Sequence, residues 1–288
     1  MPEPSDQLKP EPKPRVVPGP TGTRFAEVRW FESLDSTNRY LLNEARRGAD
    51  EGLVVVADHQ SAGRGRLGRR WEAPSAANLL VSVLLRPQLP AGARHLASSV
   101  VAMAAADACA ALGTVPVDVK WPNDLLVGGR KLAGVLAEAD MSAESRAPIV
   151  VGIGINVAWP PPPDAASPFP AELGELADSA TSLLRASGRP IDRARLLSRL
   201  LVELEPRVAG LDSPEGREAQ AADLRGRCTT IGARVRVETV DGAFTGTALD
   251  VTLQGHLVVD VDHQGPRTVV VGDVIHLRTA PEQGRSHE

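Results

Sequence analysis

Two adjacent glycines near the middle of the chain constrain the fold most. Gly128 and Gly129 separate two short apolar segments, residues 125–127 and 132–138. Glycine readily adopts the positive φ values that a two-residue hairpin turn needs, so these segments are predicted to be antiparallel strands joined by a tight turn. A hairpin excludes a purely parallel sheet and, among helices, indicates an α+β fold.

Further strands and helices surround this hairpin in irregular order. Short apolar segments bounded by Gly, Pro or Asn predict strands, and helical spacing or an Ala-rich run predicts helices. The additional strands are expected at residues 53–57, 79–85, 117–121 and 149–157. The helices are expected at residues 35–47, with Asp35 as a capping candidate, 96–112 and 191–208.

Composition divides the chain into four parts. Residues 1–22 carry seven prolines among charges, which predicts a disordered tail, with order beginning near Phe25. Residues 23–222 hold the elements above and form the larger domain. From about Arg225, short alternating segments separated by turn residues predict a small β-barrel over residues 225–280, and residues 281–288 a second disordered tail. The barrel strands are expected at residues 234–240, 246–251, 256–261 and 268–271.

Bulk properties exclude several classes of protein. The net charge of -4 argues against general affinity for nucleic acid. Cys109 and Cys228 lie far apart and outside any metal or disulfide pattern, so no metal site is predicted. No run approaches the roughly 18 apolar residues that a membrane span requires. We therefore expect a cytoplasmic protein that binds neither membrane nor DNA.

The first chemical motif is GRGRLGRRW, from Gly63 to Trp71, with four arginines among three glycines between two predicted strands. Glycine lets a backbone approach a ligand closely, and guanidinium groups bind phosphate or carboxylate oxygens. The motif also satisfies GxGxxG, but Pro74 and a strand follow instead of the helix that a dinucleotide site needs. Two interpretations stay open: an anion-binding loop, or a solvated basic loop that contacts RNA or an acidic partner.

Two more motifs follow along the chain. Lys120 and Lys131 lie in KWPNDLLVGGRKLAGVLAE, on or beside neighbouring strands, so both ammonium groups are expected to reach one pocket. The third motif is GIGIN, residues 152–156, whose glycines within a strand indicate close approach of a ligand or another backbone.

Together the three motifs, in this order and at these separations, resemble the biotin protein ligase family from about Ser33 to the C-terminal barrel. The resemblance implies a mixed central sheet flanked by helices, followed by an SH3-like barrel. It also implies that ATP activates biotin to biotinyl-AMP, which a lysine of a carboxylase's biotin carboxyl carrier domain attacks. The substrates would be ATP and biotin, with Mg²⁺ accompanying ATP.

Site residues are carried over by motif from this resemblance. The positions similar to those that bind biotin are Ser36, Thr37, Asn38, Gln60, Arg64, Gly65, Arg66 and Lys131. Those similar to positions that bind ATP or the adenylate are Gly63, Arg69, Trp71, Lys120, Asn123, Gly134 and Asn156. Lys131, Arg64, Arg66 and Asp124 are expected to be catalytic, with Asp124 orienting the incoming lysine.

Ordinary structural roles remain alternatives for several of these residues. Ser36 can cap a helix, Gln60 can be a surface residue, Trp71 can anchor the core, and Asp124 can belong to a turn.

Rival functions also remain. A lipoate ligase shares the fold class and the adenylation chemistry, whereas a related acyl transferase would need a cysteine nucleophile in a matching motif. Some family members carry an N-terminal DNA-binding module, but the proline-rich residues before Phe25 do not suit its helices. For the barrel, a lid or carrier-docking role is favoured over nucleic-acid binding, because Phe244 is the only aromatic residue from Arg225 onward.

Overall fold

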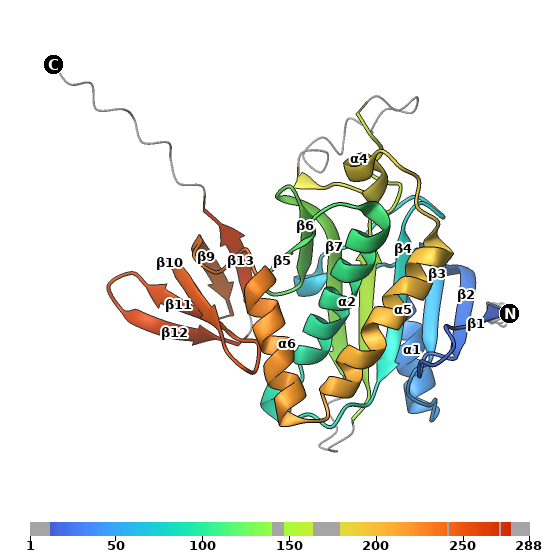
Figure 1. Ribbon diagram of the computed structural model, residues 1–288, viewed down its shortest axis with the longest axis horizontal. Coiled ribbons are helices and arrows are strands. Elements are labelled where there is room, and N and C mark those ends of the chain that lie inside the picture. Colours follow the sequence, from blue (N-terminus) through green and yellow to red (C-terminus); the bar gives the residue numbers. More distant parts are fainter. Residues whose placement is uncertain (1–11, 140–146, 164–178, 241, 271, 278–288) are drawn as a thin grey trace, which may run out of the picture.

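The computed structural model describes residues 12–139, 147–163, 179–240, 242–270 and 272–277. Over these residues the chain forms two sheets, one of eight strands and one of five. Figure 1 shows the larger sheet behind a layer of helices, with the smaller sheet projecting to one side. The strands of the larger sheet lie between Arg15 and Ile155, and those of the smaller sheet between Arg234 and His276.

The eight-stranded sheet is mixed. Strands β2 and β3 run parallel, and every other neighbouring pair is antiparallel. Its order is β1 (Arg15–Pro18), β2 (Glu27–Leu34), β3 (Val54–Gln60), β4 (Leu79–Leu85), β8 (Ile149–Ile155), β7 (Arg130–Ala139), β6 (Asp124–Val127) and β5 (Asp118–Lys120). Gly128 and Gly129 join β6 to β7 with φ values of 56° and 75°, which confirms the predicted hairpin.

Helices cover both faces of this sheet. Helix α1 (Thr37–Arg46) packs on one face, and α2 (Leu96–Gly113) and α5 (Arg193–Gly210) lie side by side on the other. Alternate residues of β3 serve the two cores: Val54 and Val56 pack with α2 and α5, and Val55 with α1. The short helix α4 (Leu183–Ser187) and the helix α6 (Pro214–Arg227) complete the helical layer.

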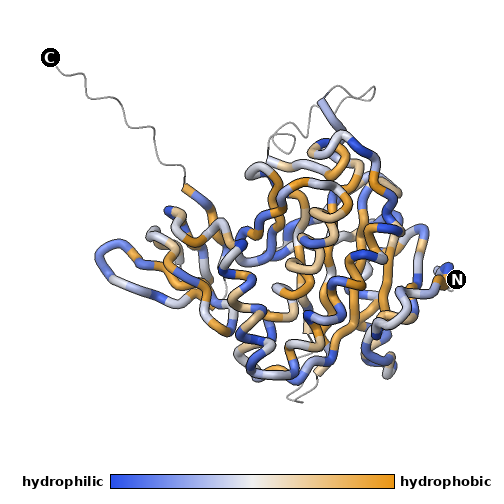
Figure 2. The backbone as a smooth tube through the Cα atoms, in the orientation of Figure 1, coloured by the Kyte–Doolittle hydropathy of each residue, from blue (hydrophilic) through white to orange (hydrophobic). Residues whose placement is uncertain are grey.

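Helix α2 corrects one expectation about hydropathy. Its 18 residues have a hydropathy of 1.6, so among the described residues one helix is long and apolar enough to cross a membrane. In the fold, however, 72% of that helix is buried, and Figure 2 shows it as a pale to orange helix against the orange strands of the sheet. Burial between the sheet and α5 accounts for its composition.

The second sheet is antiparallel and forms the small C-terminal unit. Its order is β12 (Gly265–Val269), β11 (Leu257–Val261), β10 (Gly242–Val251), β9 (Arg234–Thr239) and β13 (Asp273–His276). Apolar residues of this sheet, such as Val235 and Leu257, join the same buried cluster as Trp121 of the larger domain. The Trp121 indole Nε1–H also donates to the Gly255 carbonyl at 2.8 Å. The sheet is consistent with the expected barrel-like domain and is docked on the larger one.

Several boundaries differ from the prediction. Residues 15–18 are not disordered, because Val16 and its neighbours pair with β2; residues 1–11 and 281–288 lie outside the described residues. Helix α1 is capped by Ser36 rather than Asp35, since the Ser36 side chain accepts from the Arg39 N–H. Helix α6 was not predicted and extends past the expected domain boundary at Arg225, with only Ala221 and Leu224 buried along it.

Candidate active site

A cavity lies where α1 begins, β3 ends, and β7 and β8 pass beneath the arginine-rich loop. Its wall combines segments far apart in the sequence. The residues that line it are Ser36, Thr37, Asn38, Gln60, Arg64, Gly65, Arg66, Arg69, Arg70, Trp71, Val81, Asn123, Asp124, Lys131, Gly134, Val135, Leu136, Gly152, Ile153, Gly154 and Asp273. Most of the positions carried over by motif are therefore brought together, and Ser36, which caps α1, lines the cavity together with Thr37 and Asn38.

The first turn of α1 is held by polar contacts that leave little freedom. The Thr37 backbone N–H and hydroxyl both donate to Gln60 Oε1, at 2.8 and 3.0 Å. Ser82 is fully buried, and its hydroxyl lies 2.7 Å from Thr37 Oγ1 and 2.6 Å from Asn38 Oδ1. Gln60 is thus fixed rather than a free surface residue. We call Ser36, Thr37, Asn38 and Gln60, together with Ser82 buried behind them, the polar wall.

Asn38 crosses the cavity floor to the neighbouring strands. Its Nδ2 donates to the Leu136 carbonyl at 3.1 Å and to Glu138 Oε2 at 2.8 Å. The side chain passes directly over Gly152 of β8, where an added Cβ would lie 2.2 Å from Asn38 Oδ1. The glycine in this strand is required because the Asn38 amide occupies the space of a side chain.

Residues 63–71, which we call the arginine loop, fold back on themselves. The Trp71 N–H donates to the Gly63 carbonyl at 3.0 Å, and the Gly65 N–H donates to the Arg69 carbonyl at 2.7 Å. At the tip, Leu67 has a φ of 55° and its side chain is 64% exposed. Gly63 does not line the cavity; its role is to let the loop close, because a Cβ there would lie 2.3 Å from the Trp71 carbonyl oxygen.

The four guanidinium groups of the loop differ in their partners. Three form ion pairs: Arg64 with Glu138 at 2.9 Å, Arg69 with Asp273 at 2.5 Å, and Arg70 with Glu72 at 3.2 Å. The fourth, from Arg66, contacts two neutral oxygens instead.

Arg66 donates to Asn123 Oδ1 at 3.3 Å and to the Gly272 carbonyl at 3.0 Å. Burial lowers the pKa of Arg66, while the charges of Asp273 and Asp124 oppose that shift. Arginine stays protonated despite such a shift. Arg66 is therefore a half-buried cation whose hydrogen-bonded partners do not neutralise it, and this suits an incoming anion.

Trp71 lies across the paired strands β7 and β8. Gly134 and Gly154 are cross-strand partners, and an added Cβ at these positions would lie 3.1 and 2.5 Å from the indole. The ring fits only because both positions lack a side chain. Its Nε1 is buried without a hydrogen-bond partner among the described residues. Trp71 is thus packed on the sheet while an unsatisfied donor remains, which a simple core anchor would not require.

Lys131 lies next to this indole and opposite Asp124. Its Nζ is 5.6 Å from the Trp71 ring centroid and 2.7 Å from Asp124 Oδ1. The lysine and aspartate form an ion pair, but the angles at the two atoms are not those of a hydrogen bond. Asn123 beside them donates from Nδ2 to the Val135 carbonyl at 2.9 Å, which fixes the turn into β6.

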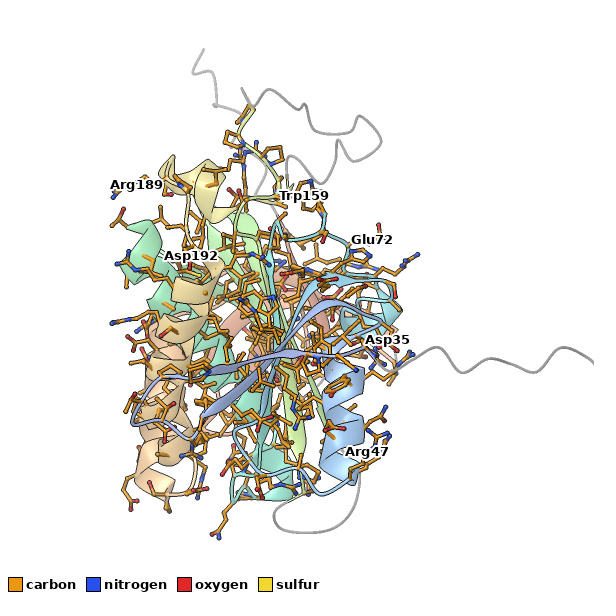
Figure 3. All side chains as sticks on the ribbon, turned by 90° about the vertical axis from the view of Figure 1, so that its right-hand side faces the viewer. Asp35, Arg47, Glu72, Trp159, Arg189 and Asp192 are labelled. Carbon is orange, nitrogen blue, oxygen red and sulfur yellow. The ribbon has the colours of Figure 1, made fainter. Side chains whose placement is uncertain are left out.

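A second cavity shares part of the same wall. Gln60, Arg70, Trp71 and Lys131 line both cavities. The second is also bounded by His59, Ser61, Glu72, Ala73, Pro74, Asn156, Trp159 and Ala180. Figure 3 shows Glu72 and Trp159 toward the same end of the molecule. Trp71 and Lys131 therefore separate two adjoining compartments.

Asn156 and Lys120 differ from the other carried-over residues. The Asn156 side chain is buried, and both ends of its amide form hydrogen bonds. Its Oδ1 accepts from Asn78 at 3.0 Å, and its Nδ2 donates to the Thr181 carbonyl at 3.0 Å. Lys120 lines neither cavity. It lies on β5, an edge strand of the larger sheet. Burial lowers the pKa of His276, and the charge of Lys120 lowers it further. The expected convergence of Lys120 with Lys131 is therefore wrong.

Comparison with known proteins agrees with this geometry. Residues 30–156 match the Biotin/lipoate A/B protein ligase family. Over 265 residues the chain is 43% identical to a biotin–acetyl-CoA-carboxylase ligase of Mycobacterium tuberculosis, covering 89% of this chain and 91% of the relative. The chain belongs to the biotin protein ligase family.

Two further biotin ligases extend the likeness. The bifunctional ligase/repressor BirA of Escherichia coli is 33% identical over 86% of this chain and 73% of its own length. Among solved structures, the biotin protein ligase of Aquifex aeolicus in complex with biotin and ATP has a TM-score of 0.70 at 25% identity, covering 88% of this chain and 99% of that one. The fold class expected from the resemblance is confirmed.

Three functional candidates escaped the sequence analysis of this biotin protein ligase. Ser82 is a single polar residue in the apolar run of β4, a signal that was available but not used. Glu138 ends the second motif and joins Asn38 to Arg64. Asp273 reaches the cavity from the C-terminal sheet, and no local pattern marks it.

The described residues contain no group of three His, Cys, Asp or Glu suited to a metal ion. The carboxylates nearest the arginine loop, Glu138, Asp124 and Asp273, each face a cation. The side chains present therefore do not form a preformed metal centre.

Proposed function

We propose that this protein uses ATP to convert biotin to biotinyl-AMP and then transfers the biotinyl group to a lysine of a biotin carboxyl carrier domain. One observation carries the proposal: a single cavity places the polar wall, the arginine loop and Lys131 around the same space. A neutral polar group, a carboxylate and a phosphate each find a suitable partner in that space.

The polar wall suits the ureido ring of biotin. A ureido group offers one carbonyl acceptor and two N–H donors, which matches the hydroxyl and amide groups of Ser36, Thr37 and Asn38. Ser82 and Gln60 already hold Thr37 and Asn38, and the Ser36 side chain accepts from the Arg39 N–H, so the wall is ordered before the ligand enters. Binding biotin there would cost little further conformational entropy.

The cationic side of the cavity suits the reacting groups. A biotin carboxylate oxygen attacks the α-phosphorus of ATP, and the bond to pyrophosphate breaks, which yields a mixed anhydride. Lys131 and Arg66 would offset the charge that grows on the α-phosphate, and Arg64 would approach the biotin carboxylate. The second compartment would hold the nucleotide, with the unpaired Trp71 Nε1–H and indole face beside it.

Asp124 fits the transfer step. Its ion pair with Lys131 would open when the lysine turns to the carboxylate and phosphate, which leaves the Asp124 carboxylate to receive the ammonium group of the carrier lysine. After losing a proton, that amine attacks the biotinyl carbonyl, an amide bond forms and AMP leaves. The roles of Asn123 and Asn156 would be positional, through the turn into β6 and the backbone of Lys131.

Lys131→Ala tests the first step. We expect pyrophosphate release in the presence of biotin and ATP to fall about 100- to 1000-fold, the usual effect of removing one donor to a developing oxyanion. Arg130→Ala is the matched control, because it removes a cation from the adjacent residue outside both cavities. Wild-type rates in Lys131→Ala would contradict the proposal.

The acyl substrate separates this function from its nearest rival, a lipoate ligase. The polar wall has several hydrogen-bonding groups, which a dithiolane ring cannot use and a ureido ring can. We expect labelled biotin, and not labelled lipoate, on a biotin carboxyl carrier domain incubated with enzyme and ATP. Efficient transfer of lipoate would contradict this assignment.

Three expectations complete the proposal. Mg²⁺ is expected to arrive with the ATP phosphates, since such sites usually need only one or two protein carboxylates. A cytoplasmic location follows from the need for ATP and a carboxylase. Specific, salt-sensitive retardation of operator DNA in a mobility-shift assay would contradict the expectation that this chain binds no DNA.

A further inference from the structure

The C-terminal sheet contributes two groups to the arginine loop. The Gly272 carbonyl accepts from Arg66 at 3.0 Å, and Asp273 pairs with Arg69 at 2.5 Å. Asp273 is also in the cavity wall, although more than 200 residues separate it from the loop. It stands at the first position of β13, opposite Glu238 of β9, so the antiparallel pairing of those strands sets its place.

We infer that Asp273 is a positioning residue for adenylate formation, acting through Arg69 and the loop to keep Arg66 directed at the cavity. This inference rests on the proposed function for its chemistry and on geometry alone for its effect on the loop. It gives the C-terminal sheet a part in the first half-reaction, before any carrier protein is bound.

The loop cannot hold these arginines by itself. Its internal backbone hydrogen bonds join Gly63 to Trp71, Gly65 to Arg69 and Arg66 to Arg69, so they hold the backbone but none of the guanidinium groups, and Leu67 at the tip stays exposed. Among the described contacts, the Arg66 guanidinium bonds only to Asn123 and to Gly272. One of its two anchors therefore belongs to the residue that precedes Asp273.

Charge explains why the two arginines have different partners. Asp273 neutralises Arg69, whose side chain is 67% exposed, and leaves the more buried Arg66 with neutral oxygens. Removing the carboxylate would free Arg69 and, with it, the tip of the loop. The repulsion between Arg69 and Arg66 would then be opposed by Asp124 alone of the two acidic groups that act on Arg66, and Arg66 would be less firmly directed at the cavity.

Asp273→Asn tests this with two measurements. In pyrophosphate release, we expect the KM for ATP to rise about two- to fivefold, the range for losing an exposed ion pair, with the KM for biotin unchanged. In limited proteolysis of the apo enzyme, we expect trypsin to cleave within residues 63–71 correspondingly faster, with the sites identified by mass spectrometry. Asp273→Glu should restore both values toward wild type.

Asp262→Asn is the matched control, since it also breaks an arginine pair of the C-terminal sheet, with Arg234, outside both cavities. Wild-type proteolysis in Asp273→Asn, or equal effects in Asp262→Asn, would overturn the inference. The two proposals fail separately: a wild-type enzyme that forms no biotinyl-AMP refutes the ligase assignment, whereas the cleavage rates still decide the role of Asp273.

Discussion

The polar wall and the arginine loop face the same cavity but are ordered in different ways. The wall is built from buried or half-buried hydroxyl and amide groups at the start of α1 and on β3 and β4. Neutral hydrogen bonds join them to one another, and Asn38 also donates to the Glu138 carboxylate. The loop holds exposed arginines through ion pairs to Glu138, Asp273 and Glu72. Buried networks are stiff and insensitive to salt, whereas exposed ion pairs are weak and screened.

This difference suits the two substrates. Biotin must be selected by the shape and polarity of its ring, which calls for fixed groups, whereas ATP must enter and pyrophosphate must leave, which calls for a loop that moves. The two parts meet at Glu138, which accepts from Asn38 of the wall and pairs with Arg64 of the loop.

Of the changes that separate the wall from the loop, Gly152→Ala should have the largest effect, because it alters the wall directly. The new methyl group would lie 2.2 Å from Asn38 Oδ1 and force this side chain to move. We expect biotin binding, measured by calorimetry, to weaken about 100-fold, as for a displacement of roughly 1 Å in a positioned group. The loop should keep its wild-type rate of trypsin cleavage.

Gly226→Ala is the control for that substitution. Nothing lies within 4 Å of the added Cβ in α6, so biotin binding should not change and the helix should gain stability, by up to about 1 kcal/mol. If Gly152→Ala binds biotin normally, Asn38 does not belong to a rigid wall and the contrast with the loop fails.

The second prediction concerns pH and the docking on which the loop depends. His95, before α2, stacks on His256 of the C-terminal domain with ring centroids 4.4 Å apart. Burial, reinforced by the charge of His256, lowers the pKa of His95 from 6.5 to about 4. Between these values the unfolded chain binds more protons than the folded one, so stability rises with pH.

The contribution of His95 to the free energy of unfolding should therefore be fully present above pH 6.5. As the pH falls toward 4, the free energy of unfolding should decrease by up to about 3 kcal/mol because of this residue. Urea unfolding at several pH values measures this. His95→Phe keeps a ring on His256 but cannot titrate, so its profile should be flatter. A profile as steep as that of the wild type would show that the pair does not couple docking to pH.

Most of the wall and the loop could be predicted from sequence because their signals are local. Apolar runs identified β3, β4 and the β6–β7 hairpin, and the motifs brought Arg66, Lys131 and Gly152 to one cavity. The predictions that failed depended on contacts between residues that are not neighbours in the local structure. Lys120 shares a motif with Lys131, but β5 is the edge strand and β6 lies between the two lysines. Strand order decides this, and no local spacing encodes it.

The same reason explains why the sequence analysis did not identify the partners of the loop. Asp273 belongs to no recognisable local motif, and only the docking of the C-terminal sheet brings it to Arg69. β1 was missed because the many prolines around it indicate disorder, although the single proline at the end of this edge strand is compatible with pairing. Helix α6 buries too few apolar residues to show a periodic pattern. In each case tertiary contacts supply what the local sequence lacks.

The effect of salt is the smallest that we expect, and it separates the wall from the loop most directly. Raising the salt concentration from about 0.05 to 0.5 M shortens the screening length from roughly 14 to 4 Å and weakens exposed ion pairs. Trypsin cleavage within residues 63–71 should then accelerate about twofold in the wild type, and Asp273→Asn should show little of this acceleration because the Arg69 pair is already absent.

Biotinol, which keeps the ureido ring but has no carboxylate, should bind with unchanged affinity at both salt concentrations. Equal salt sensitivity of loop cleavage in the two proteins would mean that contacts other than Asp273 order the loop, and salt-dependent binding of biotinol would mean that the wall is not the neutral, rigid half of the site.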